Sequence, residues 1–132
     1  MQVPPNCDLT LGMVCVDKSR PGSTVWQMTA DERFTNTAGI MQGGMLGAFA
    51  DSAMGASVVT FARQSNPSRV SCVNLEMKAS FLRPVGVGSL LTCQATVVSG
   101  GARVVFCEAA VYAGEHDLVC KATSTYLVTP RD

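Results

Sequence analysis

The chain has 132 residues, of which ten are acidic and ten are basic, so its formal net charge is zero. This balance gives no long-range attraction to nucleic acid or to an anionic membrane, and we expect neither as a partner. Hydrophobic residues make up 47% and charged residues 15%, which is typical of a globular protein. The length suits one core, and we expect a single domain over residues 1–132.

The first ten residues, MQVPPNCDLT, lack the basic and apolar regions of a secretory signal. The six cysteines are scattered singly without a C-x-x-C pair, and His116 is the single histidine, so we expect no metal site. Reduced thiols that pack as small hydrophobic groups are the simpler interpretation, while a disulfide framework stays open. We therefore expect a cytoplasmic protein.

Two strand patterns joined by a turn come first along the chain. Residues 11–16 alternate weakly, residues 19–22 (Ser-Arg-Pro-Gly) are typical of a turn, and residues 23–29 predict a returning strand. Residues 31–37 are polar and include Asn36. This part of the chain predicts a β-hairpin followed by a loop.

A long helix is predicted from Gly43 to about Arg63, and the Asn-Pro-Ser sequence at residues 66–68 ends it. One stripe is mostly apolar and can face a core; it consists of Leu46, Phe49, Ala50, Ala53, Met54, Ser57, Val58 and Phe61. A second stripe is nearly bare apart from one acid; it consists of Gly44, Gly47, Ala48, Asp51 and Gly55. Each glycine weakens a helix by about 1 kcal/mol relative to alanine, so their number indicates close approach of another backbone or of a ligand.

Asp51 is the single charged residue between Phe34 and Ala62. A membrane span is one interpretation of this helix, because its apolar length approaches about 20 residues. The cost of inserting Asp51, about 2.5–3.5 kcal/mol on insertion scales, argues against a span. A purely structural ion pair between Asp51 and an arginine is a second interpretation, and a functional carboxylate is the third.

After the helix the pattern changes to a period of two. Residues 71–81 predict a half-buried strand with one face made of Ser71, Val73, Leu75, Met77, Ala79 and Phe81. Further strands are predicted at residues 89–98, 103–113 and 118–128, separated by glycine-containing turns. This order predicts an α+β domain: a hairpin, one helix, then four antiparallel strands in a meander, with about six strands wrapped around the helix. Because the later strands are often apolar on both faces, we expect a second copy of the protein to cover one face.

Several of these residues together carry a resemblance to a known family: Asn36, Gly39, the run Gln42-Gly43-Gly44, Asp51, and the segment SFLRPVGVGSLL at residues 80–91. They resemble the hotdog-fold acyl-CoA thioesterases, and among these the phenylacetate-pathway and human-type branch. The resemblance covers nearly the whole chain after the first turn. It implies a hotdog fold, an acyl-CoA substrate, no cofactor beyond the CoA of the substrate, and a homodimer often paired into a tetramer.

The resemblance also implies roles for individual residues. Asp51 matches the catalytic carboxylate, which acts as general base on water or as nucleophile on the thioester. Gly43 matches the residue whose backbone N–H polarises the thioester carbonyl, Asn36 matches a polar residue of the same site, and Ser71 resembles a serine that helps to place the water. Gln42 departs from the family, which usually has histidine there; glutamine can donate a hydrogen bond but cannot titrate at this position.

The chemistry and the helix geometry together predict a shared site. Thioester hydrolysis needs an activated oxygen and donors for the developing oxyanion, and a helix N-terminus supplies free N–H groups. Gly43 and Asp51 are eight residues apart, which is about 12 Å along a helix axis. One thioester carbon cannot contact both, so we expect an obligate dimer in which each site takes Gly43 from one chain and Asp51 from the other.

The remaining candidates concern the substrate. The residues expected to line its binding site are Gly44, Met45, Phe49, Met54 and Phe81, although core packing is the favoured role for each of the last four. The bases that could meet the CoA phosphates are Arg63, Arg69, Lys78, Arg83 and Arg103, of which Arg83 and Arg103 are preferred. We expect hydrolysis of a small aryl- or medium-chain acyl-CoA to the free acid and CoA. The alternative is a non-catalytic acyl-CoA-binding or regulatory hotdog protein; a dehydratase is disfavoured because His116 lies in a predicted turn.

Overall fold

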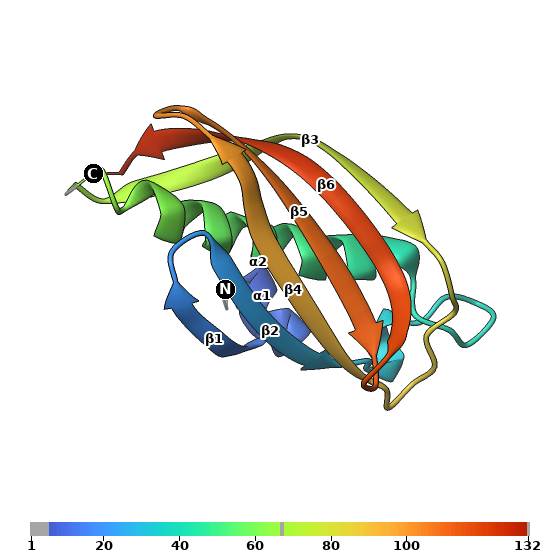
Figure 1. Ribbon diagram of the computed structural model, residues 1–132. Helices are drawn as coiled ribbons and strands as arrows, with labels where there is room; N and C mark the ends of the chain where they lie inside the picture. Colours follow the sequence, from blue (N-terminus) through green and yellow to red (C-terminus); the bar gives the residue numbers. More distant parts are fainter. Residues whose placement is uncertain (1–5, 67, 132) are drawn as a thin grey trace, which may run out of the picture.

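The computed structural model describes residues 6–66 and 68–131, and their fold is α+β. A six-stranded antiparallel sheet curves around one long helix, α2 (Gly43–Ala62), as Figure 1 shows. The strands are β1 (Val14–Arg20), β2 (Ser23–Thr29), β3 (Val70–Phe81), β4 (Leu90–Gly100), β5 (Val104–Ala113) and β6 (Asp117–Pro130). A short helix, α1 (Cys7–Leu11), precedes β1, and a 3-10 turn, η1 (Glu32–Phe34), precedes α2. The predicted helix terminator includes a proline at position 67, which lies outside the described residues.

The order of the strands differs from the predicted meander. The sheet has the order β1-β2-β4-β5-β6-β3, so the expected neighbours β3 and β4 do not pair. Instead β4 pairs with β2, and β3 lies at the edge beside β6. The error has a simple cause: α2 crosses the concave side of the sheet, so the chain enters β3 at the edge far from β2 (Figure 1). Residue periodicity predicts that a strand exists but not which strand it pairs with.

The start of the chain also differs from the prediction. Leu11 belongs to α1 instead of a strand, and it is 3% exposed in the core. Helix α1 begins because the Asn6 side chain accepts a hydrogen bond from the Leu9 N–H, and it ends at Gly12, whose φ of 71° is left-handed. Strand β1 therefore begins later than expected, and the hairpin turn is confirmed at residues 21 and 22.

The apolar stripe of α2 is confirmed as the core face. Its fully buried members are Phe49, Ala50, Ala53, Met54 and Val58, each 0% exposed. The buried polar pair is satisfied, because the Ser57 and Thr24 hydroxyls are 2.7 Å apart and Ser57 also donates to the Ala95 carbonyl. Helix α2 is long and apolar enough to cross a membrane by length and composition alone. However, α2 packs against the concave side of the sheet, so its apolar composition is that of a core helix.

The bare stripe of α2 faces strand β3. A Cβ on Gly47 would lie 3.4 Å from the Met77 methyl group, and one on Gly55 would lie 3.6 Å from the Cys72 sulfur. The expected close approach is therefore made by side chains of β3. Gly44 is the exception, since a Cβ there would meet nothing within 4 Å.

Strand β3 contains a register shift that changes which residues face the helix. Asn74 pairs with Tyr126 and Glu76 pairs with Thr125, so Leu75 is an extra residue, a β-bulge. Before the bulge, Cys72 and Asn74 reach α2; after it, Met77 and Phe81 do. The prediction that Ser71 to Phe81 form a single face is therefore wrong. The prediction that this face is buried is wrong as well, because Leu75 is 54% exposed and Phe81 is 51% exposed.

Candidate active site

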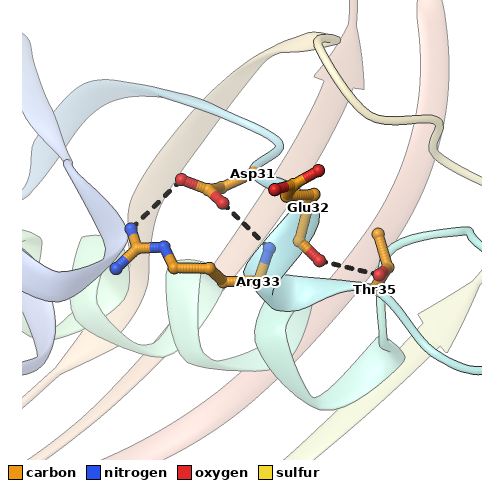
Figure 2. Close-up of polar contacts among 4 residues, drawn as sticks. All are labelled: Asp31, Glu32, Arg33 and Thr35. Carbon is orange, nitrogen blue, oxygen red and sulfur yellow. Dashed lines mark hydrogen bonds and ion pairs between the residues drawn. The ribbon is translucent and has the colours of Figure 1, made fainter.

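The loop between β2 and α2 is held by short-range polar contacts (Figure 2). Asp31 accepts a hydrogen bond from the Arg33 N–H at 2.8 Å, and the Arg33 guanidinium lies 3.1 Å from the other Asp31 oxygen. These bonds hold the pKa of Asp31 below its ordinary value. The Thr35 hydroxyl donates to the Glu32 carbonyl at 2.7 Å. The loop therefore has a defined shape before the chain reaches Asn36.

Asn36 stabilises the next turn with its own side chain. Its Oδ1 accepts hydrogen bonds from the N–H groups of Ala38 at 2.9 Å and Ile40 at 3.3 Å. Such local bonding is typical of asparagine in turns. Since Oδ1 is occupied, the Nδ2 group is the part of the side chain left for a ligand.

The N-terminus of α2 begins at Gln42, which is the N-cap residue. Its backbone is extended, its N–H donates to the Phe34 carbonyl at 2.7 Å, and its exposed side chain makes no capping hydrogen bond. Among the described residues, no group accepts from the N–H of Gly43 or Gly44. The helix thus presents two free donors, and its dipole favours negative charge at this end.

A cavity of about 390 Å³ lies beside this helix end. It is lined by Asn36, Ile40, Met41, Gly43, Leu46, Phe81, Leu82, Arg83 and Pro84. The structure therefore places four predicted site residues, Asn36, Gly43, Phe81 and Arg83, around one space. The Phe81 ring packs directly on Gly43, because a Cβ there would lie only 3.2 Å from it. The Arg83 guanidinium is 3.8 Å from the Asp117 carboxylate, and both side chains are exposed.

Asp51 lies two turns further along α2 and is held by two residues that the sequence did not indicate. The Tyr126 hydroxyl donates to Asp51 Oδ1 at 2.7 Å, and Asn74 Nδ2 donates to the same oxygen at 2.8 Å. Burial and this hydrogen bond raise the pKa of Tyr126 well above its ordinary value, so its hydroxyl stays protonated. Among the described residues no cation pairs with Asp51 and no donor reaches Oδ2. Within the described residues, the structure therefore gives no support to the interpretation of Asp51 as a structural ion pair with arginine.

A second cavity, of about 400 Å³, lies along the turns of α2 that follow Asp51. It is lined by Asp8, Lys18, Trp26, Ser52, Gly55, Ala56, Val59, Thr60, Arg63, Ser71 and Cys72. This wall lies close to the carboxylate, because Cys72 contacts the Gly55 carbonyl while Asn74, two residues later on the same face of β3, bonds to Asp51. Burial, followed by the nearby charge of Asp51, raises the pKa of the Cys72 thiol to about 11. Ser71 and Arg63 therefore lie at the second cavity, away from the end of the helix.

The other predicted residues lie apart from both cavities. Phe49 and Met54 are fully buried in the core, and Met45 packs partly buried against it. Arg103 lines a separate cavity of about 390 Å³ together with Asn66 and Val128. A cavity of about 600 Å³ between the β1–β2 turn and β4 contains none of the predicted site residues. In residues 6–66 and 68–131, no three His, Cys, Asp or Glu side chains gather as a metal site would require.

Asn74 and Tyr126 are the residues that sequence reasoning missed. The period of two assigned Asn74 to the face opposite Met77, and only the bulge at Leu75 brings both to the helix. Tyr126 had no signal at all, because its contact with Asp51 spans 75 positions. Asparagine is depleted in strands, so its presence between Val73 and Leu75 was the one available sign of a special role.

A curved antiparallel sheet wrapped around one long helix is the hotdog architecture, and among the described residues Asp51 Oδ2 on the bare face of that helix has no hydrogen-bond partner. The chain belongs to the thioesterase superfamily, whose family model matches residues 38–120. It is 29% identical to a Saccharolobus solfataricus protein provisionally described as an esterase, over 85% of this chain and 71% of that protein.

Two solved structures extend the comparison. A Ralstonia eutropha protein, described as a thioesterase related to phenylacetic acid degradation, is 31% identical. The match covers 96% of this chain and 92% of that one, with a TM-score of 0.80. A Streptococcus pneumoniae thioesterase solved with coenzyme A is 24% identical, covers 90% of this chain and 87% of that one, and has a TM-score of 0.79. The protein is thus a thioester hydrolase of the branch that contains the phenylacetic acid degradation proteins.

Proposed function

We propose that the protein hydrolyses a small aryl- or medium-chain acyl-CoA to the free acid and CoA, and that Asp51 is the reacting carboxylate. The observation that carries this proposal is the state of Asp51: one oxygen is held by neutral donors, and the other has no partner among the described residues. A carboxylate that is oriented but not neutralised by a cation can serve as a base or a nucleophile. The Streptococcus pneumoniae structure with coenzyme A supports the CoA part of the substrate.

The proposed site is shared between two copies of the chain. Gly43 and Asp51 are separated by about 12 Å along α2, which is too far for one carbonyl group to contact both. Strand β3 supports a partner here, because it is an edge strand beside the face that carries Asp51. It exposes apolar side chains, including Val73 at 49% and Leu75 at 54%, and an uncovered apolar edge favours pairing with another chain. A homodimer, alone or paired into a tetramer, follows.

In this arrangement each chain supplies part of the chemistry. The free N–H groups of Gly43 and Gly44 stabilise the negative charge that develops on the thioester oxygen. Asp51 of the other chain acts in one of two ways. As a general base it takes a proton from the water that attacks the carbonyl carbon. As a nucleophile it attacks that carbon itself and forms an acyl–aspartyl anhydride, which water hydrolyses after CoA has left. In both cases the carbon–sulfur bond breaks, and the CoA thiolate leaves and takes up a proton. Asn36 Nδ2 and the side-chain amide of Gln42 lie at the helix end, where they can donate to the substrate.

The acyl group has a cavity of suitable size beside the reacting carboxylate. The second cavity begins one residue after Asp51, at Ser52, and its lining combines the apolar Gly55, Ala56 and Val59 with charged side chains such as Lys18 and Arg63. Its volume of about 400 Å³ accommodates an aryl or medium-chain group. On this proposal Ala56→Phe raises the KM for hexanoyl-CoA and phenylacetyl-CoA about 10-fold or more and leaves acetyl-CoA hydrolysis unchanged. Equal effects on all three would place the acyl group elsewhere.

A thiol-release assay tests the reaction. The panel is acetyl-, hexanoyl-, octanoyl-, benzoyl- and phenylacetyl-CoA, and the variants are Asp51→Asn and the matched control Asp17→Asn. Asp17 is exposed on β1, where its carboxylate accepts hydrogen bonds from the Ser19 N–H and hydroxyl. We expect at least a 100-fold loss with Asp51→Asn and full activity with Asp17→Asn. Acyl-CoA binding without release by the wild type would favour the non-catalytic alternative, and full activity of Asp51→Asn would overturn the assigned carboxylate.

A further inference from the structure

The hydrogen bonds to Asp51 are unevenly distributed between its two carboxylate oxygens. Both donors, Tyr126 and Asn74, bind the same oxygen, Oδ1, and none binds Oδ2 among the described residues. The two donors are a directly opposed pair on adjacent antiparallel strands, so they project from the same face of the sheet onto the helix. Two bonds from a rigid sheet fix both the rotation of the carboxyl group and the identity of the oxygen left over.

Tyr126 makes this contact from within the hydrophobic core. Its ring is 2% exposed, while its hydroxyl reaches the helix and lies 2.7 Å from Asp51 Oδ1 and 3.1 Å from the Asp51 backbone carbonyl. A hydroxyl has one hydrogen, and the charged carboxylate is the stronger acceptor. The ring passes close to α2 at Gly55, one turn along the helix, where a Cβ would lie in ordinary contact 4.0 Å from Tyr126 Cε1.

Asn74 depends on the bulge in β3. The extra residue Leu75 lets Asn74 face the helix although Met77, three positions later, also faces it. Bulges near active sites commonly re-aim a side chain in this way. The amide is neutral, as is the tyrosine hydroxyl, so the pair orients the carboxylate without cancelling its charge.

We propose that Tyr126 and Asn74 are positioning residues that hold Asp51 Oδ1 and thereby direct Oδ2 at the substrate. The inference rests on the proposed function of Asp51 and adds a role for two residues on a different part of the fold. A group placed off its reactive geometry loses rate even when substrate binding is intact. The loss should therefore appear in kcat and leave KM within about twofold.

The experiment combines single variants with a double-mutant cycle. Tyr126→Phe removes one oxygen and keeps the buried ring, and Asn74→Ala changes an exposed side chain, so both variants should fold; circular dichroism and thermal unfolding check this. Hydrogen bonds to a charged group predict a 10- to 100-fold loss of kcat for each. Asn74→Asp removes the donor and adds a like charge, so its loss should exceed that of Asn74→Ala. Tyr112→Phe is the matched control: Tyr112 lies on β5 beside Gln27 and Thr92, away from both cavities of the proposed site, so this variant should keep full kcat.

The cycle separates positioning from a structural role. In the Asp51→Asn background, Tyr126→Phe should cause no further loss of the residual rate, because there is no reacting carboxylate left to orient. A merely structural hydroxyl would give the same loss in both backgrounds, which would overturn the inference. Wild-type kcat in both single variants, with Asp51→Asn inactive, would also overturn it while leaving the proposed function intact. An Asp51→Asn variant with wild-type activity would defeat the proposed function itself.

Discussion

Gly43→Ala tests directly where the thioester carbonyl binds. A Cβ at this position would lie 3.2, 3.3 and 3.4 Å from three carbons of the Phe81 ring. Relaxed carbon–carbon contacts are about 3.5–4.0 Å, so the ring must retreat by about 0.3–0.5 Å. Phe81 is 51% exposed, and the ring can move toward solvent without opening a cavity in the core. The free energy of unfolding should therefore change by less than about 1 kcal/mol.

The effect on activity should be larger than the effect on stability. Gly43 and Phe81 line the same cavity, so the new methyl group and the displaced ring both shift the position of the carbonyl relative to the Gly43 N–H. A misplacement of about 1 Å costs about 100-fold in rate. Scaling that penalty logarithmically to 0.3–0.5 Å predicts a loss of about 4- to 10-fold in kcat/KM.

The assay is CoA release at saturating and limiting substrate, with chemical denaturation in parallel. Gly47→Ala is the matched control, because a Cβ there meets only the flexible Met77 methyl group, at 3.4 Å. This control should gain up to about 1 kcal/mol of stability as an alanine within a helix, with activity changed by less than twofold. A Gly43→Ala variant with unchanged stability and wild-type kcat/KM would refute the placement of the carbonyl at this helix end.

Three further predictions concern assembly and packing. Leu75→Asp should convert the protein to a monomer in sedimentation and reduce specific activity more than 10-fold; a fully active monomer contradicts the shared site. Gly100→Ala should cost about 1–3 kcal/mol of unfolding free energy, because its Cβ would lie 2.5 Å from the Phe61 ring, whereas Gly101→Ala should be neutral. Burial raises the pKa of Cys93 from 9.0 to about 12, so the stability that it contributes is complete below pH 9 and is lost as pH rises towards 12. The thermal midpoint should fall more steeply over that interval in the wild type than in Cys93→Ala, and equal slopes would contradict this reasoning.

Local patterns in the sequence predicted the local parts of this structure. The apolar period from Leu46 to Val58 and the glycine pair at Gly43 indicated the helix almost to its observed ends. Asp51 stood out because it was the single charge in that segment. These features depend on residues within a few turns of one another, where spacing along the chain decides spacing in the fold.

Non-local contacts account for what the sequence did not predict. The pairing of β3 with β6 joins segments about 50 residues apart, and alternation within each strand is compatible with several orders. The contact of Tyr126 with Asp51 depends on that pairing. The contact of Asn74 with Asp51 also depends on the bulge at Leu75, and the alternation of apolar and polar residues in the sequence continues through this position without a break. The predicted catalytic and binding roles of all the site residues, Gln42 and Ser71 among them, stay predictions, because the partner chain that would complete their surroundings follows only from the proposed dimer.

The bulge at Leu75 changes which residues of β3 face the helix: even-numbered residues do so before it and odd-numbered residues after it. If the surplus residue were absorbed nearer the start of β3, then Ser71, Val73 and Leu75 would turn inward together with Met77, and a leucine would stand where Asn74 now meets Asp51. That slipped arrangement keeps the sheet and matches the hydrophobic pattern better than the observed one. The position of this one extra residue thus decides whether Asn74 reaches the Asp51 carboxylate. A bulge at another position would remove one of the two bonds to Oδ1 and lower the rate without unfolding the protein.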